Sequence, residues 1–271
     1  MPELPEVETT VRGLRPVLEG RRIESIELRR ADLRRPFPVD LRQRLTGARV
    51  TGLARRAKYG LIDTDRGDTL VFHLGMSGSW RIDPIDLGKH DHVLIRTDAG
   101  RSLSLNDPRR FGSVDLLRSD CIERSPPFAA MGPEPLGDDF DGAYLKRALE
   151  GRTAPIKALL LDQRLVAGLG NIYVCDALNL AGIAPGRAGG GLSRSRLDRL
   201  ADAIKMVLLD AIEAGGSSLR NYVRPNGELG YFSSKWRVYG REGQPCPRCS
   251  APVRRRVDGG RSTFYCAKCQ H

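Results

Sequence analysis

The stretch PELPEVET, residues 2–9, opens the chain directly after Met1, and the rest of the sequence is organised around it. Met1 precedes a small residue, which is the usual signal for removal of an initiator methionine, so Pro2 is expected to carry a free secondary amine. An N-terminal amine has a pKa of about 7.7–8.0, and a useful fraction is therefore neutral and nucleophilic at neutral pH. Its attack on an aldehyde-level carbon gives an iminium ion, which has no N–H to lose and acts as an electron sink. Glu3 could hold or deliver a proton beside it.

A helix is expected to begin inside this stretch, because Val7, Val11 and Leu14 recur at helical spacing over residues 6–19. The plainer interpretation of the N-terminus is therefore a solvated chain end with Pro5 at the start of a helix.

The pattern changes after this helix to short runs rich in β-branched and aliphatic residues, separated by Gly, Asp and Pro. The predicted strands are residues 23–28, 49–53, 61–64, 69–74, 92–97, 102–105 and 113–117. Seven or eight short strands at this spacing predict a β-sandwich or flattened barrel, on which the N-terminal helix packs.

The second half of the chain is expected to be helical. Residues 119–137 contain four prolines and little periodicity, which indicates a linker. Helices are predicted at residues 142–150, 154–162, 171–181 and 195–214. The predicted fold is therefore of the α+β class. A β-sandwich domain at 1–118 and the linker at 119–137 precede a helical domain at 138–238 and a cysteine-rich tail at 239–271.

The net charge and the distribution of cysteines limit the class of partner and the cellular compartment that can be expected. The chain has 44 Lys and Arg against 33 Asp and Glu, a net charge of +11, which favours a polyanionic partner. The start of the sequence has no signal-peptide pattern and no stretch approaches a membrane span, so a cytoplasmic protein is expected. The uneven distribution of six cysteines argues against a disulfide framework.

Four cysteines form the motif C-x2-C-x16-C-x2-C, made by Cys246, Cys249, Cys266 and Cys269. Four thiolates in two such knuckles predict a tetrahedral zinc site, and a closed site of this kind is structural because no position stays open for catalysis. Arginines lie between the knuckles, among them Arg261, and suit phosphate contact. The alternative is a zinc ribbon that only stabilises the fold or binds protein.

Two further motifs are compatible with phosphate binding. The segment GLGN, residues 168–171, precedes a predicted helix, and its glycines let backbone N–H groups approach an anion. On its own this segment is equally an ordinary tight turn. The run RRAKY, residues 55–59, is basic, and its plainer interpretation is a solvated strand end.

Two glycine-flanked loops carry bulky side chains. HLGMSG, residues 73–78, presents Met76, and NDPRRFG, residues 106–112, presents Arg109 and Phe111. Such residues are usually part of a core. On an exposed loop beside an arginine, however, an apolar side chain is suited to wedging between base pairs, which an enzyme that flips a base requires.

Together, these motifs resemble the formamidopyrimidine-DNA glycosylase family along essentially the whole chain, from Pro2 to Gln270. The resemblance implies a bifunctional DNA glycosylase and AP lyase that removes oxidised purines from duplex DNA. It implies that Pro2 attacks C1′, that Glu3 is the general acid and that Glu6 orients the N-terminus. Lys58, in the R-x-K-Y stretch, would assist strand scission by β- and δ-elimination.

The resemblance also implies how DNA is held. Met76 and Arg109 would fill the void left by the flipped nucleotide, with Arg109 facing the orphaned cytosine and Phe111 wedging the stack. Phosphate contacts would come from His90, Lys157, Asn171 and Arg261. Lesion recognition would come from a capping loop that includes Ser217, Arg220, Asn221 and Tyr222.

One structural zinc ion is the expected cofactor, and duplex DNA is the expected partner. The protein is expected to be a monomer in the bacterial cytoplasm, near the nucleoid. The sequence departs from the family pattern at Gly60, where Leu is common, and at Cys175-Asp176, where Asn-Glu is usual. Two alternatives stay open at this point. One is an endonuclease VIII-like glycosylase for oxidised pyrimidines, and the other is a non-catalytic zinc-ribbon DNA-binding protein.

Overall fold

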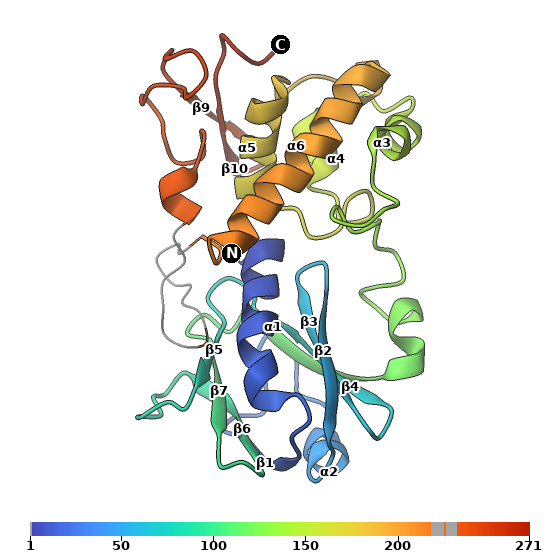
Figure 1. Cartoon of the computed structure of the whole chain (residues 1–271), viewed down its shortest axis with the longest axis vertical. Helices are drawn as coiled ribbons and strands as arrows, with labels where there is room; N and C mark the ends of the chain where they lie inside the picture. The colour runs from blue at the N-terminus through green and yellow to red at the C-terminus, as the bar shows by residue number, and fades with distance from the viewer. Residues whose placement is uncertain (1, 218–224, 226–231) are drawn as a thin grey trace. The chain divides into compact units, whose positions relative to one another are not determined.

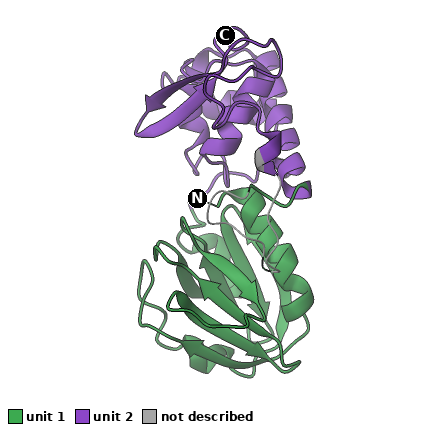
Figure 2. Cartoon of the chain, turned by 90° about the vertical axis from the view of Figure 1, so that its left-hand side faces the viewer, with its two compact units in different colours: residues 1–129, 214–231 green, residues 130–213, 232–271 purple. Residues whose placement is uncertain are grey.

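The computed structural model describes residues 2–217, 225 and 232–271, and the chain divides into two compact units (Figure 2). Unit 1 comprises residues 1–129 and 214–231, and unit 2 comprises residues 130–213 and 232–271. The chain thus leaves unit 1, builds most of unit 2, returns to unit 1 and ends in unit 2. The functional division predicted at residues 118, 137 and 238 follows motifs rather than compactness and stays a prediction.

Unit 1 begins with helix α1 (Leu4–Leu18), whose start is fixed by its own sequence. Glu3 is the N-cap, and its backbone N–H donates to Glu6 Oε2 at 2.8 Å in a capping-box arrangement. Val7, Val11 and Leu14 are buried along one face, as their spacing predicted. In Figure 1, α1 lies beside strands of the β-domain, and it contacts β2, β3 and β5.

Eight strands follow in two four-stranded antiparallel sheets, which confirms the predicted sandwich. One sheet has the order β1-β6-β7-β5 and the other β2-β3-β4-β8. The strands are β1 (Ile23–Leu28), β2 (Val50–Arg56), β3 (Tyr59–Thr64), β4 (Asp68–His73), β5 (Ser79–Ile82), β6 (Asp91–Thr97), β7 (Ser102–Asn106) and β8 (Ser113–Arg118). A five-residue helix, α2 (Leu41–Leu45), lies between β1 and β2, and a 3-10 helix (Ser119–Arg124) follows β8. The sequence prediction missed β5 and α2, which have only four and five residues.

The core between the sheets explains the departure at Gly60. Gly60 pairs with Phe72 across β3 and β4, and a Cβ on Gly60 would lie 2.1 Å from the Phe72 ring. Phe72 is fully buried and meets Trp80 edge-on, with ring centroids 5.6 Å apart. The phenylalanine ring therefore fills the space that a larger residue at position 60 would need.

Unit 2 contains the helices and the cysteine-rich tail. The helices are α3 (Gly142–Leu149), α4 (Ile156–Leu160), α5 (Asn171–Ala181) and α6 (Arg194–Glu213), and short 3-10 turns lie at Gly189–Gly191 and Phe232–Lys235. All four predicted helices are present, with α4 shorter than predicted. The tail forms a two-stranded hairpin of β9 (Arg254–Asp258) and β10 (Arg261–Tyr265). Within the residues that the structure describes, no helix is long and apolar enough to cross a membrane.

Candidate active site and nucleic-acid interface

Glu6 joins the N-terminus to a residue far away in the sequence. Its Oε2 accepts the Glu3 backbone N–H at 2.8 Å, and its Oε1 accepts the Ser217 backbone N–H at 2.7 Å across 211 positions. Pro2, Glu3, Glu6 and Ser217 are all buried. The Glu6 carboxylate thus binds both Glu3, the neighbour of the predicted nucleophile Pro2, and Ser217, at the start of the predicted lesion-capping loop. Arg220, Asn221 and Tyr222, the other predicted lesion contacts, lie outside the described residues.

Lys58 lies in the two-residue turn between β2 and β3, where Arg56 pairs with Tyr59. Ala57 has a φ of 53°, so this turn is held in a left-handed conformation that a residue with a Cβ rarely adopts. The Lys58 side chain is buried, and the next residue, Tyr59, packs its ring 4.7 Å from His73. The basic run is therefore packed into the fold rather than being a solvated strand end.

His73, at the end of β4, is a neutral group inside this basic environment. Burial, together with the positive charges of Lys58, Arg34 and Arg35, lowers the pKa of His73 to about 4. Its Nδ1 accepts the Gly75 backbone N–H at 3.0 Å, which requires Nδ1 to be unprotonated. The sequence prediction did not single out His73, although it begins the HLGMSG loop.

The low pKa of His73 predicts a pH dependence of stability. An unfolded chain protonates this histidine near pH 6.5, whereas the folded chain resists protonation down to about pH 4. The free energy of unfolding should therefore fall as the pH drops from 6.5 towards 4, by at most about 3 kcal/mol from this group. His73→Asn keeps an acceptor for Gly75 N–H but cannot titrate, so it should lose less stability over that interval.

Urea unfolding of unit 1 at pH 7.5 and pH 5 would measure this difference, with Trp80 as the fluorophore in a Trp236→Phe background. Equal losses of stability in the wild type and in His73→Asn would contradict the assignment.

The two predicted wedge loops present their bulky side chains at the surface. Met76 is 38% exposed and Phe111 is 44% exposed, so neither belongs to the core. The Arg109 guanidinium lies over the Phe111 ring, with Cζ 5.0 Å from the ring centroid. These three residues are therefore available to a ligand, as the family resemblance implies.

His90 is half-buried in the loop before β6, with its ring 6.2 Å from that of His92. The buried carboxylate of Asp91 accepts the Gly88 N–H at 2.8 Å and fixes this loop. The sequence prediction also missed Ser77 and Asp107, which are buried and bonded to each other between the wedge loops. An Asp ahead of a Pro and a Ser between two glycines were the available signals, but both are common in ordinary turns.

In unit 2, Lys157 and Asn171 meet at the zinc hairpin, beside Arg261. Lys157 Nζ donates to Thr263 Oγ1 at 2.6 Å and to the Ser262 carbonyl at 3.2 Å, and Asn171 Nδ2 donates to the same carbonyl at 2.9 Å. Lys157 is only 3% exposed, and burial lowers its pKa. Arg261 is exposed at the start of β10. Both side chains thus support the strand that presents Arg261.

Asn171 begins α5 after Gly170, and no side chain caps this helix end. Gln163 shapes the preceding glycine loop, because its Oε1 accepts the Gly168 N–H at 2.9 Å and its Nε2 donates to the Leu169 carbonyl at 2.9 Å. The Asn171 amide uses one donor for Ser262, and its other N–H is the group suited to a phosphate.

Asp176, the second departure from the family pattern, is fully buried in α5. Its carboxylate accepts the backbone N–H groups of Arg237, Val238 and Tyr239 at 3.0–3.1 Å. Burial raises its pKa, and the three N–H donors oppose that rise. The shorter acid therefore makes a contact of its own, which holds the segment that leads into the zinc hairpin.

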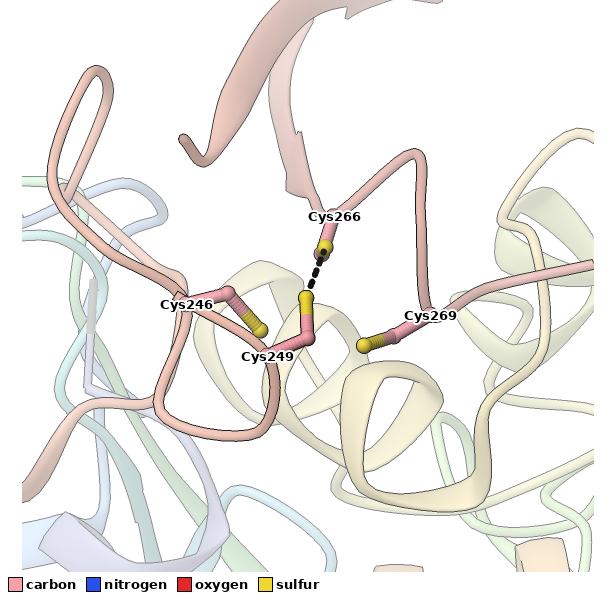
Figure 3. Close-up of side chains that lie close together, drawn as sticks. All are labelled: Cys246, Cys249, Cys266 and Cys269. Atoms are coloured by element: carbon pink, nitrogen blue, oxygen red, sulfur yellow. Dashed lines mark hydrogen bonds between the residues drawn. The ribbon is translucent and has the colours of Figure 1, made fainter. Parts of the chain in front are cut away.

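The four predicted zinc ligands lie together. Their sulfur atoms are all within 4.8 Å of one another, and Figure 3 shows the sulfurs pointing into one space between the two knuckles. Cys249 Sγ and Cys266 Sγ are 3.6 Å apart. A tetrahedral zinc with Zn–S bonds of about 2.3 Å needs sulfurs about 3.8 Å apart, so the thiolates fit this ion. One structural zinc is thus the cofactor of this chain.

Three protein-family models match consecutive parts of the chain. The formamidopyrimidine-DNA glycosylase N-terminal domain matches residues 1–114, and the H2TH domain of the same enzyme matches residues 131–223. A zinc finger found in FPG and IleRS matches residues 243–271.

Relatives match over their full length. The formamidopyrimidine-DNA glycosylase of Rhizorhabdus wittichii is 70% identical over 270 residues, covering 100% of both chains. The crystal structure of the Fpg protein from Thermus thermophilus is 40% identical with a TM-score of 0.90, covering 99% of this chain and 98% of that one. A Lactococcus lactis Fpg mutant bound to DNA containing Fapy-dG is 37% identical with a TM-score of 0.92, covering 99% of each chain.

An N-terminal β-sandwich, a helical H2TH segment and a four-cysteine zinc finger, in this order, define a DNA glycosylase of base-excision repair. Within that class, the full-length match and the 70% sequence identity to a formamidopyrimidine-DNA glycosylase decide the family. The chain belongs to the formamidopyrimidine-DNA glycosylase family.

Proposed function

We propose that this chain excises oxidised purines from duplex DNA and then cleaves the strand, with Pro2 as nucleophile and Glu3 as general acid. The observation that carries the proposal is the Glu6 carboxylate, which holds the Glu3 and Ser217 backbones together at the buried N-terminus. A nucleophile must be held within reach of its acid, and this arrangement restricts both.

The steps of the proposed reaction follow from the chemistry of the Pro2 secondary amine. The Pro2 nitrogen forms a bond to C1′ while the bond from C1′ to the base breaks, and the proton lost from the amine passes to the departing base, which leaves neutral. Glu3 gives a proton to the sugar ring oxygen as the ring opens, which leaves a cationic iminium between Pro2 and C1′. Loss of a C2′ proton then expels the 3′ phosphate, and a second elimination expels the 5′ phosphate. Lys58, buried beside the neutral His73, is the proposed assistant in strand scission.

The partner is duplex DNA, as in the Lactococcus lactis complex with Fapy-dG DNA. Met76 and Arg109 fill the void left by the extruded nucleotide and Phe111 wedges the stack. His90, Asn171 and Arg261 contact phosphates, with Lys157 behind the zinc hairpin. Ser217 and the residues that follow it cover the extruded base. The zinc serves this binding by holding the hairpin, and the net charge of +11 favours a polyanion. The enzyme acts as a monomer in the bacterial cytoplasm, at the nucleoid.

A base-release assay tests the substrate class. Duplexes carrying 8-oxoguanine, a ring-opened purine or an oxidised pyrimidine would be compared under one condition. Release of the two purine lesions well ahead of the pyrimidine supports the proposal. Release of the pyrimidine alone would assign the chain to the endonuclease VIII-like activity, and no release at all would leave only DNA binding.

Arg109 is expected to read the base opposite the lesion. Arginine donates to the acceptors on the pairing edge of cytosine, whereas adenine presents a different pattern, and Arg109 is exposed on its loop. Arg109→Ala should therefore lose the preference for damage opposite C over damage opposite A, by about 1–3 kcal/mol. Excision rates on the two duplexes would measure it, with Arg110→Ala as the matched neighbour. An unchanged C-to-A preference would show that Arg109 does not read that base.

A further inference from the structure

The two wedge loops are joined through one buried carboxylate. Asp107 has no exposed surface, and both of its carboxylate oxygens are used. Oδ1 accepts the Ser77 hydroxyl at 2.6 Å, and Oδ2 accepts the Gly112 backbone N–H at 2.8 Å. Ser77 Oγ in turn accepts the Arg109 backbone N–H at 3.1 Å. The two hydrogen bonds made by Ser77 therefore connect the loop that carries Met76 to the loop that carries Arg109, and the bond from Gly112 to Asp107 closes the second loop on itself.

The backbone of Asp107 extends this connection. Its carbonyl accepts the Arg110 N–H at 3.2 Å and lies 3.0 Å from His92 Nε2, while its own N–H donates to the His90 carbonyl at 3.0 Å. One residue thus fixes both wedge loops and the loop of the predicted phosphate contact His90.

The loops are also pressed against each other with no space for a larger residue. Gly75 has a φ of 62°, and a Cβ there would lie 2.3 Å from the Phe111 carbonyl carbon. A Cβ on Gly112 would lie 2.8 Å from the His73 carbonyl oxygen. Arg110, between the two wedge residues of its loop, holds a left-handed φ of 58°, which costs free energy in a residue with a Cβ. Such a turn persists only where surrounding bonds hold it, and Asp107 supplies two of them, through its carbonyl to the Arg110 N–H and through its carboxylate to the Gly112 N–H.

Burying a carboxylate is unfavourable unless hydrogen bonds compensate it. Among the described residues, Asp107 has no ion pair, and its carboxylate is balanced only by the Ser77 hydroxyl and the Gly112 N–H. Each of these two donors belongs to one of the two wedge loops. The buried carboxylate therefore serves to hold the loops in place rather than to carry a charge.

We propose that Asp107 is the positioning residue that presents Met76, Arg109 and Phe111 to DNA as one preformed wedge, and that Ser77 couples the two loops through it. The inference rests on the proposed function, since a wedge matters only if a duplex must be opened. Asp107 acts through other side chains and does not touch the reacting atoms. Its loss should therefore slow base extrusion and leave the chemistry at C1′ intact.

The test compares two substrates that differ in the need for a wedge. A duplex with 8-oxoguanine opposite C must be opened, whereas a single-stranded oligonucleotide with an abasic site has no base to extrude. Ser77→Ala and Asp107→Asn should slow excision from the duplex about tenfold or more, because each loses a buried hydrogen bond to a charged group or its partner. Both should cleave the single-stranded abasic site within about twofold of the wild-type rate.

Ser79→Ala is the matched control, since Ser79 lies two positions further on, in β5, and its hydroxyl makes no hydrogen bond within the described part of the chain. It should match the wild type on both substrates. A 2-aminopurine base next to the lesion gives a second readout, because its fluorescence reports unstacking on binding. The increase expected with the wild type should be smaller with Ser77→Ala, and this variant stays informative if Asp107→Asn folds poorly.

Equal losses on both substrates would show that Asp107 only maintains the fold. No loss on either would show that the loops hold their positions without it. Failure of the wild type itself to act on the 8-oxoguanine duplex would instead contradict the proposed function, so the two failures are distinguishable.

Discussion

Replacing Cys266 by serine is expected to remove zinc and to abolish high-affinity DNA binding, while most of the far-UV circular dichroism remains. Cys266 Sγ is one of four sulfurs within 4.8 Å of one another, and three thiolates hold zinc much less tightly than four. The hairpin that the zinc closes buries few apolar residues of its own and relies on the metal to fold. The sandwich core of unit 1 is a separate cluster and should persist.

DNA binding should fall because Arg261 loses its support. Without zinc, the Ser262 and Thr263 positions that receive Lys157 and Asn171 are no longer fixed, and a buried lysine is left without partners. Arg261→Ala should reproduce part of the loss with zinc still bound, and should lower the salt dependence of binding by about one phosphate contact.

Zinc content, circular dichroism and DNA affinity would be measured on the same preparations. Cys121→Ser is the matched control, because Cys121 lies in unit 1 and is not among the four ligands. Full-strength DNA binding by a zinc-free Cys266→Ser protein would show that the hairpin does not take part in binding.

Much of the fold could be predicted because its signals are local. The spacing of Val7, Val11 and Leu14 predicted α1, and alternating short runs predicted seven of the eight strands. The knuckle spacing predicted the clustered cysteines, since two C-x-x-C turns at the ends of a hairpin bring four thiols together. In the first two cases the physical cause lies within a few residues, and in the third it lies within a single hairpin.

The rest could not be predicted because its causes are distant in sequence. Nothing near Glu6 indicates that its carboxylate holds Ser217, 211 positions away. Nothing near Gly60 reveals that the Phe72 ring occupies the space beside it. Asp107 similarly appears as an ordinary turn residue until both loops are placed. Contacts of this kind depend on the completed fold, and they determine how precisely the candidate site is held.

Blocking the Pro2 amine is expected to abolish both base excision and strand cleavage. If Met1 is retained, the Pro2 nitrogen is a tertiary amide without nucleophilic character, so an otherwise identical protein with a retained N-terminal residue should be inactive. Incubation of the processed protein with an 8-oxoguanine duplex and sodium borohydride should reduce the iminium to a stable covalent complex. N-terminal peptide mapping should place the DNA on Pro2.

Pro2→Gly is the informative control, because glycine also offers an amine at the N-terminus and should still form a trapped complex. The blocked protein should give none, although its DNA affinity should persist, since the wedge loops and the zinc hairpin are unchanged. Comparison of the processed and the blocked protein therefore separates the effect of the nucleophile from the effect of the DNA-binding surface. A crosslink that maps to Lys58, or trapping that survives in the blocked protein, would contradict Pro2 as the nucleophile. Lys58 is the alternative to test because it is a buried amine in the same unit.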